Sequence, residues 1–77
     1  MMQTVTGSDR VRVEVNGDQR VLPRGTTLGD LLRSLALDPR MVVIEHNRSI
    51  LRDRSTYDTL VLDSGDTLEI VHFVGGG

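Results

Sequence analysis

Few side chains in this 77-residue chain are suited to catalysis. It has no cysteine, so a thiolate nucleophile, a disulfide and a Cys-based metal site are excluded. The histidines, His46 and His72, have no serine or carboxylate at a motif spacing, and their separation is not that of metal ligands. Asp63 and Asp66 flank a turn cluster, where carboxylates cap backbone N–H groups. The sequence therefore predicts no catalytic side chain and no metal site.

What remains is the run Gly75-Gly76-Gly77. Because glycine lacks a Cβ, such a tail can thread a narrow channel and bring its carboxylate against a partner's nucleotide. Adenylation would give a mixed anhydride with a good leaving group, and attack by sulfur would give a thiocarboxylate. The chain has neither cysteine nor lysine to capture the activated acyl group itself. The alternative is a frayed end or a linker remnant, since flexible glycine termini are common.

The segment before the glycines, Thr67–Phe73, predicts a strand that is apolar on both faces. Alternation places Leu68 and Ile70 on one face and Val71 and Phe73 on the other. If the first pair packs on a helix, the second pair lies on the outer face of the sheet, which should be polar in so small a domain. Val71 and Phe73 are therefore a candidate docking patch. The alternative is that Phe73 folds over the sheet edge.

Hydrophobic periodicity predicts the elements that position this tail. Strands are expected at 11–15 and 19–22, joined by a hairpin turn at Asn16-Gly17. A helix is expected next, with Thr27 as its N-cap and Asp30 near its N-terminus. Its apolar face is formed by Leu28, Leu31, Leu32 and Leu35, and Asp38-Pro39 is expected to stop it.

A β-branched run at 41–44 predicts a buried central strand that continues to Glu45 or His46, followed by a short strand at 49–51. The fold class is thus α+β, a mixed sheet of four to five strands packed on one main helix. The helix is expected to join parallel, adjacent strands in the middle of the sheet by a right-handed crossover. Its leucines are expected to pack against Val11, Val13, Val15, Val43, Leu68 and Ile70.

Composition narrows the class of protein. We expect one domain at 11–74, a flexible extension at 1–10 and a flexible glycine tail at 75–77. The nine basic residues are all arginines, scattered among acids, and the net charge is −2, so nucleic-acid binding is disfavoured. No apolar stretch predicts a membrane span, and the polar N-terminus does not resemble a signal peptide. The expected location is cytoplasmic.

The chain resembles the ThiS family, the sulfur carriers of thiamine-thiazole biosynthesis, over residues 11–77. The most specific match is Gly-Asp-Thr-Leu-Glu-Ile-Val-His-Phe-Val-Gly-Gly-Gly at 65–77, which is closer to this family than to its molybdopterin-synthase cousin MoaD. Other matches are Val15-Asn16-Gly17, Gly25–Leu28, Asp30–Leu32 and Val42–Asn47. The resemblance implies a ubiquitin-like β-grasp fold.

The resemblance also implies a carrier protein, a co-substrate of partner enzymes, with no bound cofactor. A ThiF-like adenylyltransferase would use MgATP to activate the carboxylate of Gly77, and a cysteine desulfurase would supply sulfur. The Gly77 thiocarboxylate would then serve a ThiG-like thiazole synthase. Gly76 and Gly77 match the family's terminal pair, and Gly75 is an additional glycine. Gly75 and Gly76 would thread through the partner's active-site channel. Val71 and Phe73 map onto the family's apolar partner-facing surface.

Two other functions stay open. One is a sulfur carrier for molybdopterin, cysteine or tRNA thiolation, in which only the acceptor differs. The other is a ubiquitin-like interaction module that binds partners without acyl chemistry.

Overall fold

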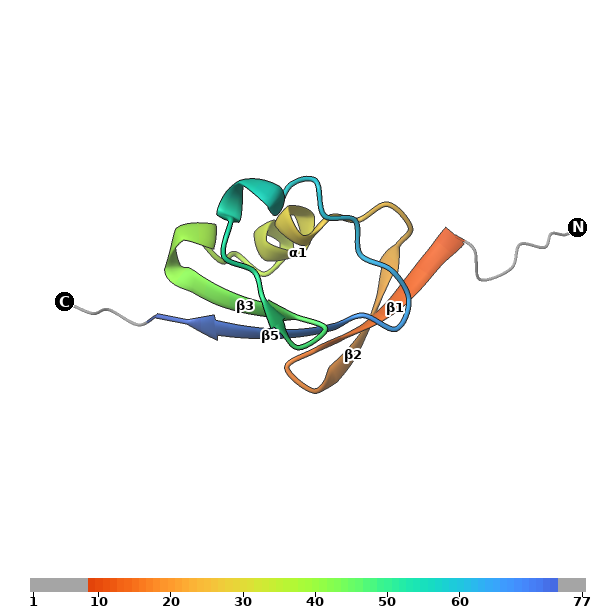
Figure 1. The fold of residues 1–77 in the computed structure, drawn as a ribbon. Helices are drawn as coiled ribbons and strands as arrows, with labels where there is room; N and C mark the ends of the chain where they lie inside the picture. Colours follow the sequence, from red (N-terminus) through yellow and green to blue (C-terminus); the bar gives the residue numbers. More distant parts are fainter. Residues whose placement is uncertain (1–8, 74–77) are drawn as a thin grey trace, which may run out of the picture.

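A computed structural model describes residues 9–73 of the chain. They form a mixed five-stranded sheet that packs on one α-helix (Figure 1). The elements are β1 (Arg10–Val15), β2 (Asp18–Pro23), α1 (Leu28–Ser34), the 3-10 turn η2 (Pro39–Met41), β3 (Val42–His46), β4 (Ser49–Ile50), the 3-10 turn η3 (Arg54–Thr56) and β5 (Thr67–His72). All predicted strands and the predicted helix are confirmed, with their ends shifted by a few residues.

The sheet order is β2-β1-β5-β3-β4, so β5, the last strand within residues 9–73, lies at the centre. β5 pairs in parallel with β1 and antiparallel with β3, while β2 and β4 form the two edges. The prediction that the helix joins adjacent parallel strands is wrong. It joins β2 to β3, and these are separated in the sheet by β1 and β5. The architecture is nevertheless the predicted ubiquitin-like β-grasp.

Local capping fixes where α1 begins. The hydroxyl of Thr27 accepts a hydrogen bond from the N–H of Asp30 at 3.0 Å, and the Asp30 carboxylate accepts one from the N–H of Thr27 at 3.0 Å. This reciprocal capping box satisfies two N–H groups that lack a partner within the helix. The two residues between Thr27 and Asp30 find partners outside the helix. The N–H of Leu28 donates to the carbonyl of Leu60, and the N–H of Gly29 donates to the carbonyl of Tyr57.

The helix stops earlier than predicted. Its last residue is Ser34, and Ala36 already has a left-handed φ of 58°. The left-handed residue reverses the chain, as at many helix C-termini, although glycine is commoner there. Asp38 instead caps the short turn η2 by accepting a hydrogen bond from the N–H of Arg40.

The core lies between α1 and one face of the sheet. Its buried apolar residues are Val11, Val13, Val15, Leu28, Leu31, Leu32, Val42, Ile44, Tyr57, Leu62, Leu68 and Ile70. The sequence predicts that Val43 lies in the core, and this is wrong, because Val42 and Ile44 face the helix and Val43 faces away. A continuous β-branched run carries no alternation from which its inward face could be identified. Leu35 is only partly buried.

We expect Thr27→Ala to lower the free energy of unfolding by about 1 kcal/mol, because it removes the oxygen that caps the N–H of Asp30. Urea unfolding followed by circular dichroism measures the change. Thr27→Ser keeps the hydroxyl and is the matched control. Equal stability of the alanine and serine variants would show that the capping box contributes nothing.

Candidate functional site

β5 is the strand that leads to the glycines, and β3 holds it along its whole length. Their register runs from His46 opposite Leu68 to Val42 opposite His72. One residue further on, Phe73 donates its N–H to the carbonyl of Met41 at 2.8 Å. Gly75, Gly76 and Gly77, the domain end at 74 and most of the extension at 1–10 lie outside the described residues, so these assignments stay predictions.

Asn16 holds β5 from the other side. The ladder between β1 and β5 ends where Val15 lies opposite Leu68, and the N–H of Asn16 then donates to the carbonyl of Leu68 at 2.8 Å. The side-chain amide of Asn16 accepts from the N–H of Ile70 at 2.7 Å and donates to its carbonyl at 3.2 Å. The Asn16 side chain thus makes the two hydrogen bonds to Ile70 that a further residue of β1 would make if the ladder continued. The sequence predicts Asn16 as a turn residue, and this second role is a finding of the structure.

The predicted docking patch is exposed. Val71 and Phe73 keep 59% and 46% of their surface accessible, so both side chains face solvent. Val43 lies opposite Val71 on the outer face, and Met41 is joined to Phe73 by a backbone hydrogen bond. Ile50 shares the same face, because it is exposed and lies opposite Glu45, the neighbour of the inward-facing Ile44. We call Met41, Val43, Ile50, Val71 and Phe73 the apolar patch; the sequence predicts only its last two members.

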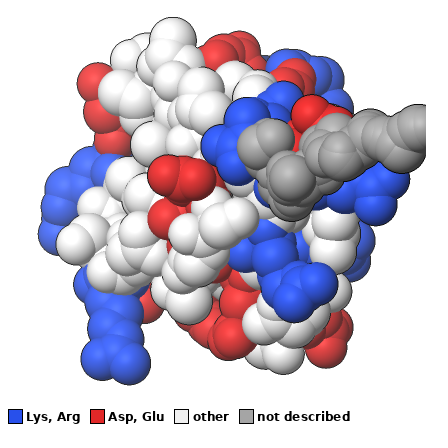
Figure 2. All heavy atoms as spheres, turned by 90° about the vertical axis from the view of Figure 1, so that its right-hand side faces the viewer, with Lys and Arg blue, Asp and Glu red and all other residues white. Residues whose placement is uncertain are grey.

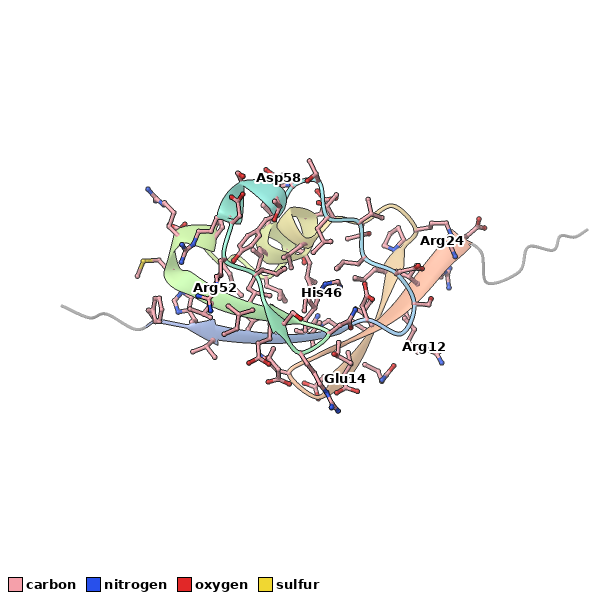
Figure 3. The ribbon with its side chains drawn as sticks, viewed as in Figure 1. Arg12, Glu14, Arg24, His46, Arg52 and Asp58 are labelled. Atoms are coloured by element: carbon pink, nitrogen blue, oxygen red, sulfur yellow. The ribbon has the colours of Figure 1, made fainter. Side chains whose placement is uncertain are left out.

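Acidic side chains continue the outer face beyond the apolar patch. Glu45 and Glu69 lie directly opposite each other on β3 and β5, and Glu14 lies beside them on β1. Figure 3 shows Glu14 on the side of the sheet that faces away from α1. Arg48 lines the same shallow hollow. Like charges opposite each other across strands are destabilising, so this acidic row has no structural advantage for the isolated domain.

A polar cluster fixes the beginning of β5. His46 Nε2 lies 3.2 Å from Asp66 Oδ2, and the Asn47 amide donates to Asp66 Oδ1 at 3.1 Å. Asn47 also accepts from the N–H of Thr67 at 2.9 Å, and Asp66 accepts from the N–H of Asp63 at 2.8 Å. His46 is therefore structural and Asp66 is a turn residue, as predicted. That the two meet is not evident from their spacing of twenty residues in sequence.

Burial of Asp66 acts to raise the pKa of its carboxyl group. Hydrogen bonds from the N–H of Asp63, from Asn47 and from His46 outweigh that effect, so its pKa lies below the ordinary value. The carboxylate is thus held ionised by the same contacts that join the turn at 63–66 to the turn between β3 and β4.

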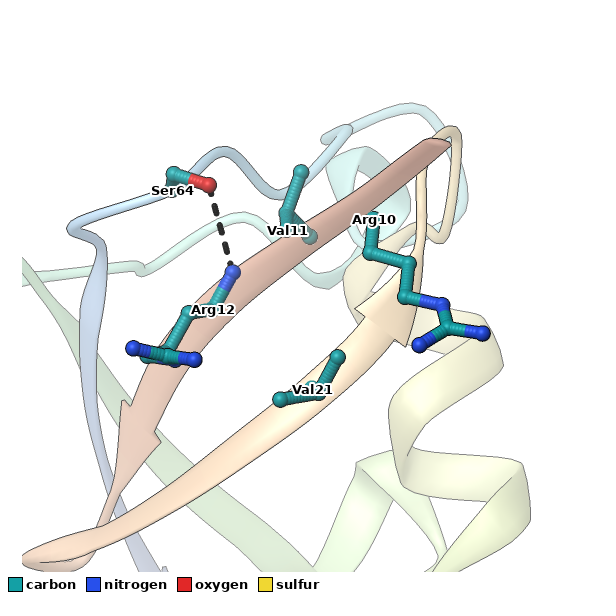
Figure 4. A pocket seen from close by; sticks show the side chains of 5 residues that line it. All are labelled: Arg10, Val11, Arg12, Val21 and Ser64. Carbon is teal, nitrogen blue, oxygen red and sulfur yellow. Dashed lines mark hydrogen bonds between the residues drawn. The ribbon is translucent and has the colours of Figure 1, made fainter. Parts of the chain in front are cut away.

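At the end of the sheet where β1 begins, no comparable cluster of polar side chains forms among the described residues. A hollow there is lined by Arg10, Val11, Arg12, Val21 and Ser64, and Ser64 Oγ accepts from the N–H of Arg12 at 3.2 Å (Figure 4). The guanidinium groups of Arg10 and Arg12 point apart on either side of Val21, so they do not converge on one anion. Seen from this end, basic and acidic side chains are interspersed (Figure 2).

Within residues 9–73, no group of three or more histidine or acidic side chains is arranged to hold a metal ion. None of the helices in this part of the chain has the length and apolar character needed to cross a membrane.

A central last strand that leads to glycines, on a sheet wrapped around one helix, defines a ubiquitin-like β-grasp protein. The model of the ThiS family matches residues 13–77. The chain is 38% identical over 66 residues to the sulfur carrier protein ThiS of Bacillus subtilis. The matched region covers 84% of this chain and 98% of that protein. The chain belongs to the ThiS family, as its motifs predict.

Two further comparisons agree with this assignment. A crystal structure of the thiamine biosynthesis protein ThiS from Geobacter metallireducens superposes with a TM-score of 0.71 at 27% identity, covering 87% of this chain and all of that one. The chain is also 39% identical over 67 residues to a thiazole synthase of Magnetococcus marinus. That match covers 87% of this chain and only 20% of the thiazole synthase.

We expect Asp66→Asn to destabilise the domain at pH 7, because a neutral amide weakens the contacts with Asp63 and His46. The folded pKa of Asp66 is lowered, so its stabilisation is complete above the unfolded pKa of about 4 and is lost as the pH falls through the folded value. The stability difference from the unmodified chain should therefore shrink between pH 7 and pH 3.

Urea unfolding at both pH values measures this difference. Asp18→Asn, at an exposed position on β2, is the matched control because it removes a carboxylate without these hydrogen bonds. A difference that stays constant with pH would contradict the assignment of Asp66.

Proposed function

We propose that this protein is a sulfur carrier of thiamine biosynthesis, and that its reacting group is the carboxylate of Gly77. Membership of the ThiS family and the name of the Bacillus subtilis relative support this proposal. The structural observation that carries it is the position of β5. This strand is fixed on both sides at the centre of the sheet and leads directly to the glycines.

The proposed chemistry takes place at the peptide end. A ThiF-like adenylyltransferase would bind MgATP, and the Gly77 carboxylate would attack the α-phosphorus and release pyrophosphate. Persulfide sulfur from a cysteine desulfurase would then displace AMP, and a thiol would reduce the acyl disulfide to the thiocarboxylate. The role of this chain is to present its end, with Gly75 and Gly76 offering no side chain to obstruct a narrow channel.

The acceptor is proposed from the relatives. Two proteins named thiazole synthase, from Magnetococcus marinus and Paramagnetospirillum magneticum, contain a segment similar to this chain, which spans about a fifth of their length. A carrier segment within a thiazole synthase supports a ThiG-like partner for the separate chain. The carrier is then a co-substrate rather than an enzyme, it needs no bound cofactor, and a cytoplasmic location fits this role.

The outer face of the sheet is the proposed surface for these partners. The apolar patch borders the strand end that must approach the active site, and the acidic row borders the patch. An apolar centre with a charged rim is the usual anatomy of a protein interface. The acidic row would favour a partner with basic residues and would speed its association.

Loading with sulfur should be visible as a change in mass. We expect the intact protein, incubated with a ThiF-like enzyme, MgATP and a persulfide source, to gain about 16 Da by exchange of oxygen for sulfur at an activated carboxylate. Removal of Gly76-Gly77 should abolish the gain and leave the thermal midpoint nearly unchanged. Intact-mass spectrometry and thermal melting test both statements.

A protein that binds a competent activating enzyme but gains no mass would be an interaction module instead. An unchanged mass gain after the two glycines are removed would place the reacting group elsewhere in the chain.

We expect Val71→Asp to weaken binding to the adenylyltransferase at least tenfold, because it places a charge in the centre of the apolar patch. Val61→Asp is the matched control, since Val61 is exposed to a similar degree, 55% against 59%, outside the patch. Titration calorimetry measures the affinities and urea unfolding checks the fold. Equal affinities of the two variants would exclude the patch as the docking surface.

A further inference from the structure

Beyond the apolar patch, β5 presents an unused backbone edge. Successive residues of a strand direct their N–H and C=O groups to opposite sides. Thr67 and Phe73 bond toward β3, since the Thr67 carbonyl accepts from Asn47 and the N–H of Phe73 donates to Met41. Leu68 and Ile70 bond toward β1, through Asn16. By this alternation, the backbone groups of His72 also point to the β1 side.

β1 does not reach His72. Its register with β5 ends at Leu68, and the Asn16 side chain adds one further step at Ile70. The chain then turns away through Gly17 into β2. Figure 1 shows β5 continuing past the end of β1 toward the C-terminus. Among residues 9–73, no strand pairs with this side of β5 at His72.

The opposite margin of the sheet is closed at the same level. The carbonyl of Val42 lies on the side of β3 that is away from β5, and it accepts from Arg54 Nη2 at 3.2 Å. Arg54 Nε donates to the carbonyl of Pro39 at 2.9 Å. The carbonyl of Ile44 is taken by the N–H of Leu51. The side chain of Arg54 therefore blocks an added strand beside β3, whereas the backbone of His72 has no partner on the β1 side within residues 9–73.

We infer that the enzyme that adenylates Gly77 supplies an extended main-chain segment that pairs with β5 at His72, in line with Asn16 and in the place that β1 leaves open. This inference rests on the proposed function. Main-chain pairing at His72 would then hold the carrier on the enzyme, in addition to the side-chain contacts at the apolar patch.

The length of the tail requires the enzyme to come this close. Four residues, Val74 to Gly77, separate Phe73 from the C-terminal carboxylate. Four extended residues span at most about 14 Å, so an active site that surrounds Gly77 also brings protein surface beside His72. Contact with the neighbouring Val71 and Phe73 would remove water from this edge. Backbone groups that lose water without gaining a partner are costly, and a paired strand is the usual solution.

His72→Pro tests the pairing. It removes the N–H that faces the open side and places the proline ring there, while the hydrogen bonds toward β3 come from the neighbouring residues. His72→Ala is the matched control, because it removes the side chain and keeps the N–H. We expect the proline variant to bind the adenylyltransferase at least tenfold more weakly than the alanine variant, with thermal midpoints within a few degrees of each other. Equal affinities would overturn the inference.

Amide hydrogen exchange of the unmodified chain gives an independent test, which holds even if the proline variant fails to fold. In the free protein, the amide of His72 should exchange faster than that of Phe73, which bonds to Met41. On complex formation with the adenylyltransferase, the His72 amide should become protected. An amide that exchanges equally fast in the complex would overturn the pairing.

These experiments distinguish failure of the edge pairing from failure of the proposed carrier function. If the unmodified chain is not adenylated by a competent enzyme, the carrier function fails. If it is adenylated while His72→Pro and His72→Ala bind equally well, only the edge pairing fails.

Discussion

The insertion of β5 between β1 and β3 is the constraint on which the other features depend. Leu68 and Ile70 on its inner face close the core over α1, Val71 on its outer face forms the apolar patch, and its end leads to the glycines. The proposed function requires the glycines to be presented from a fixed origin. A central strand held from both sides provides a more rigid origin than an edge strand.

Three polar residues in the segments that resemble the ThiS family hold this strand. Asn16 bonds to Ile70 through its side chain, Asn47 bonds to Thr67, and Asp66 joins Asn47 and His46. Each lies in a turn, where the backbone is free to present a polar side chain to a neighbouring strand. Polar residues that look suited to catalysis are thus used to position β5, and the proposed chemistry is left to the peptide end.

The proposed recognition surfaces lie along the strand that leads to the tail. The apolar patch and the open edge at His72 border the end of β5, and the acidic row continues the outer face toward the beginning of β5. In the proposed function the carrier serves an activating enzyme and then an acceptor enzyme, and a docking surface on the strand that leads to Gly77 would suit both. At the end of the sheet where β1 begins, Arg10 and Arg12 point apart and do not converge.

The sequence by itself determined the class of elements, the capping of α1 by Thr27, the outward position of Val71 and the absence of cysteine, because these depend on local pattern and composition. It could not determine the strand order, the face of Val43, or the contacts of Asn16 with Ile70 and of His46 with Asp66. These depend on which distant strands become neighbours. Only the packing of the whole sheet on α1 decides that, since inserting β5 at the centre brings residues from both ends of the chain together.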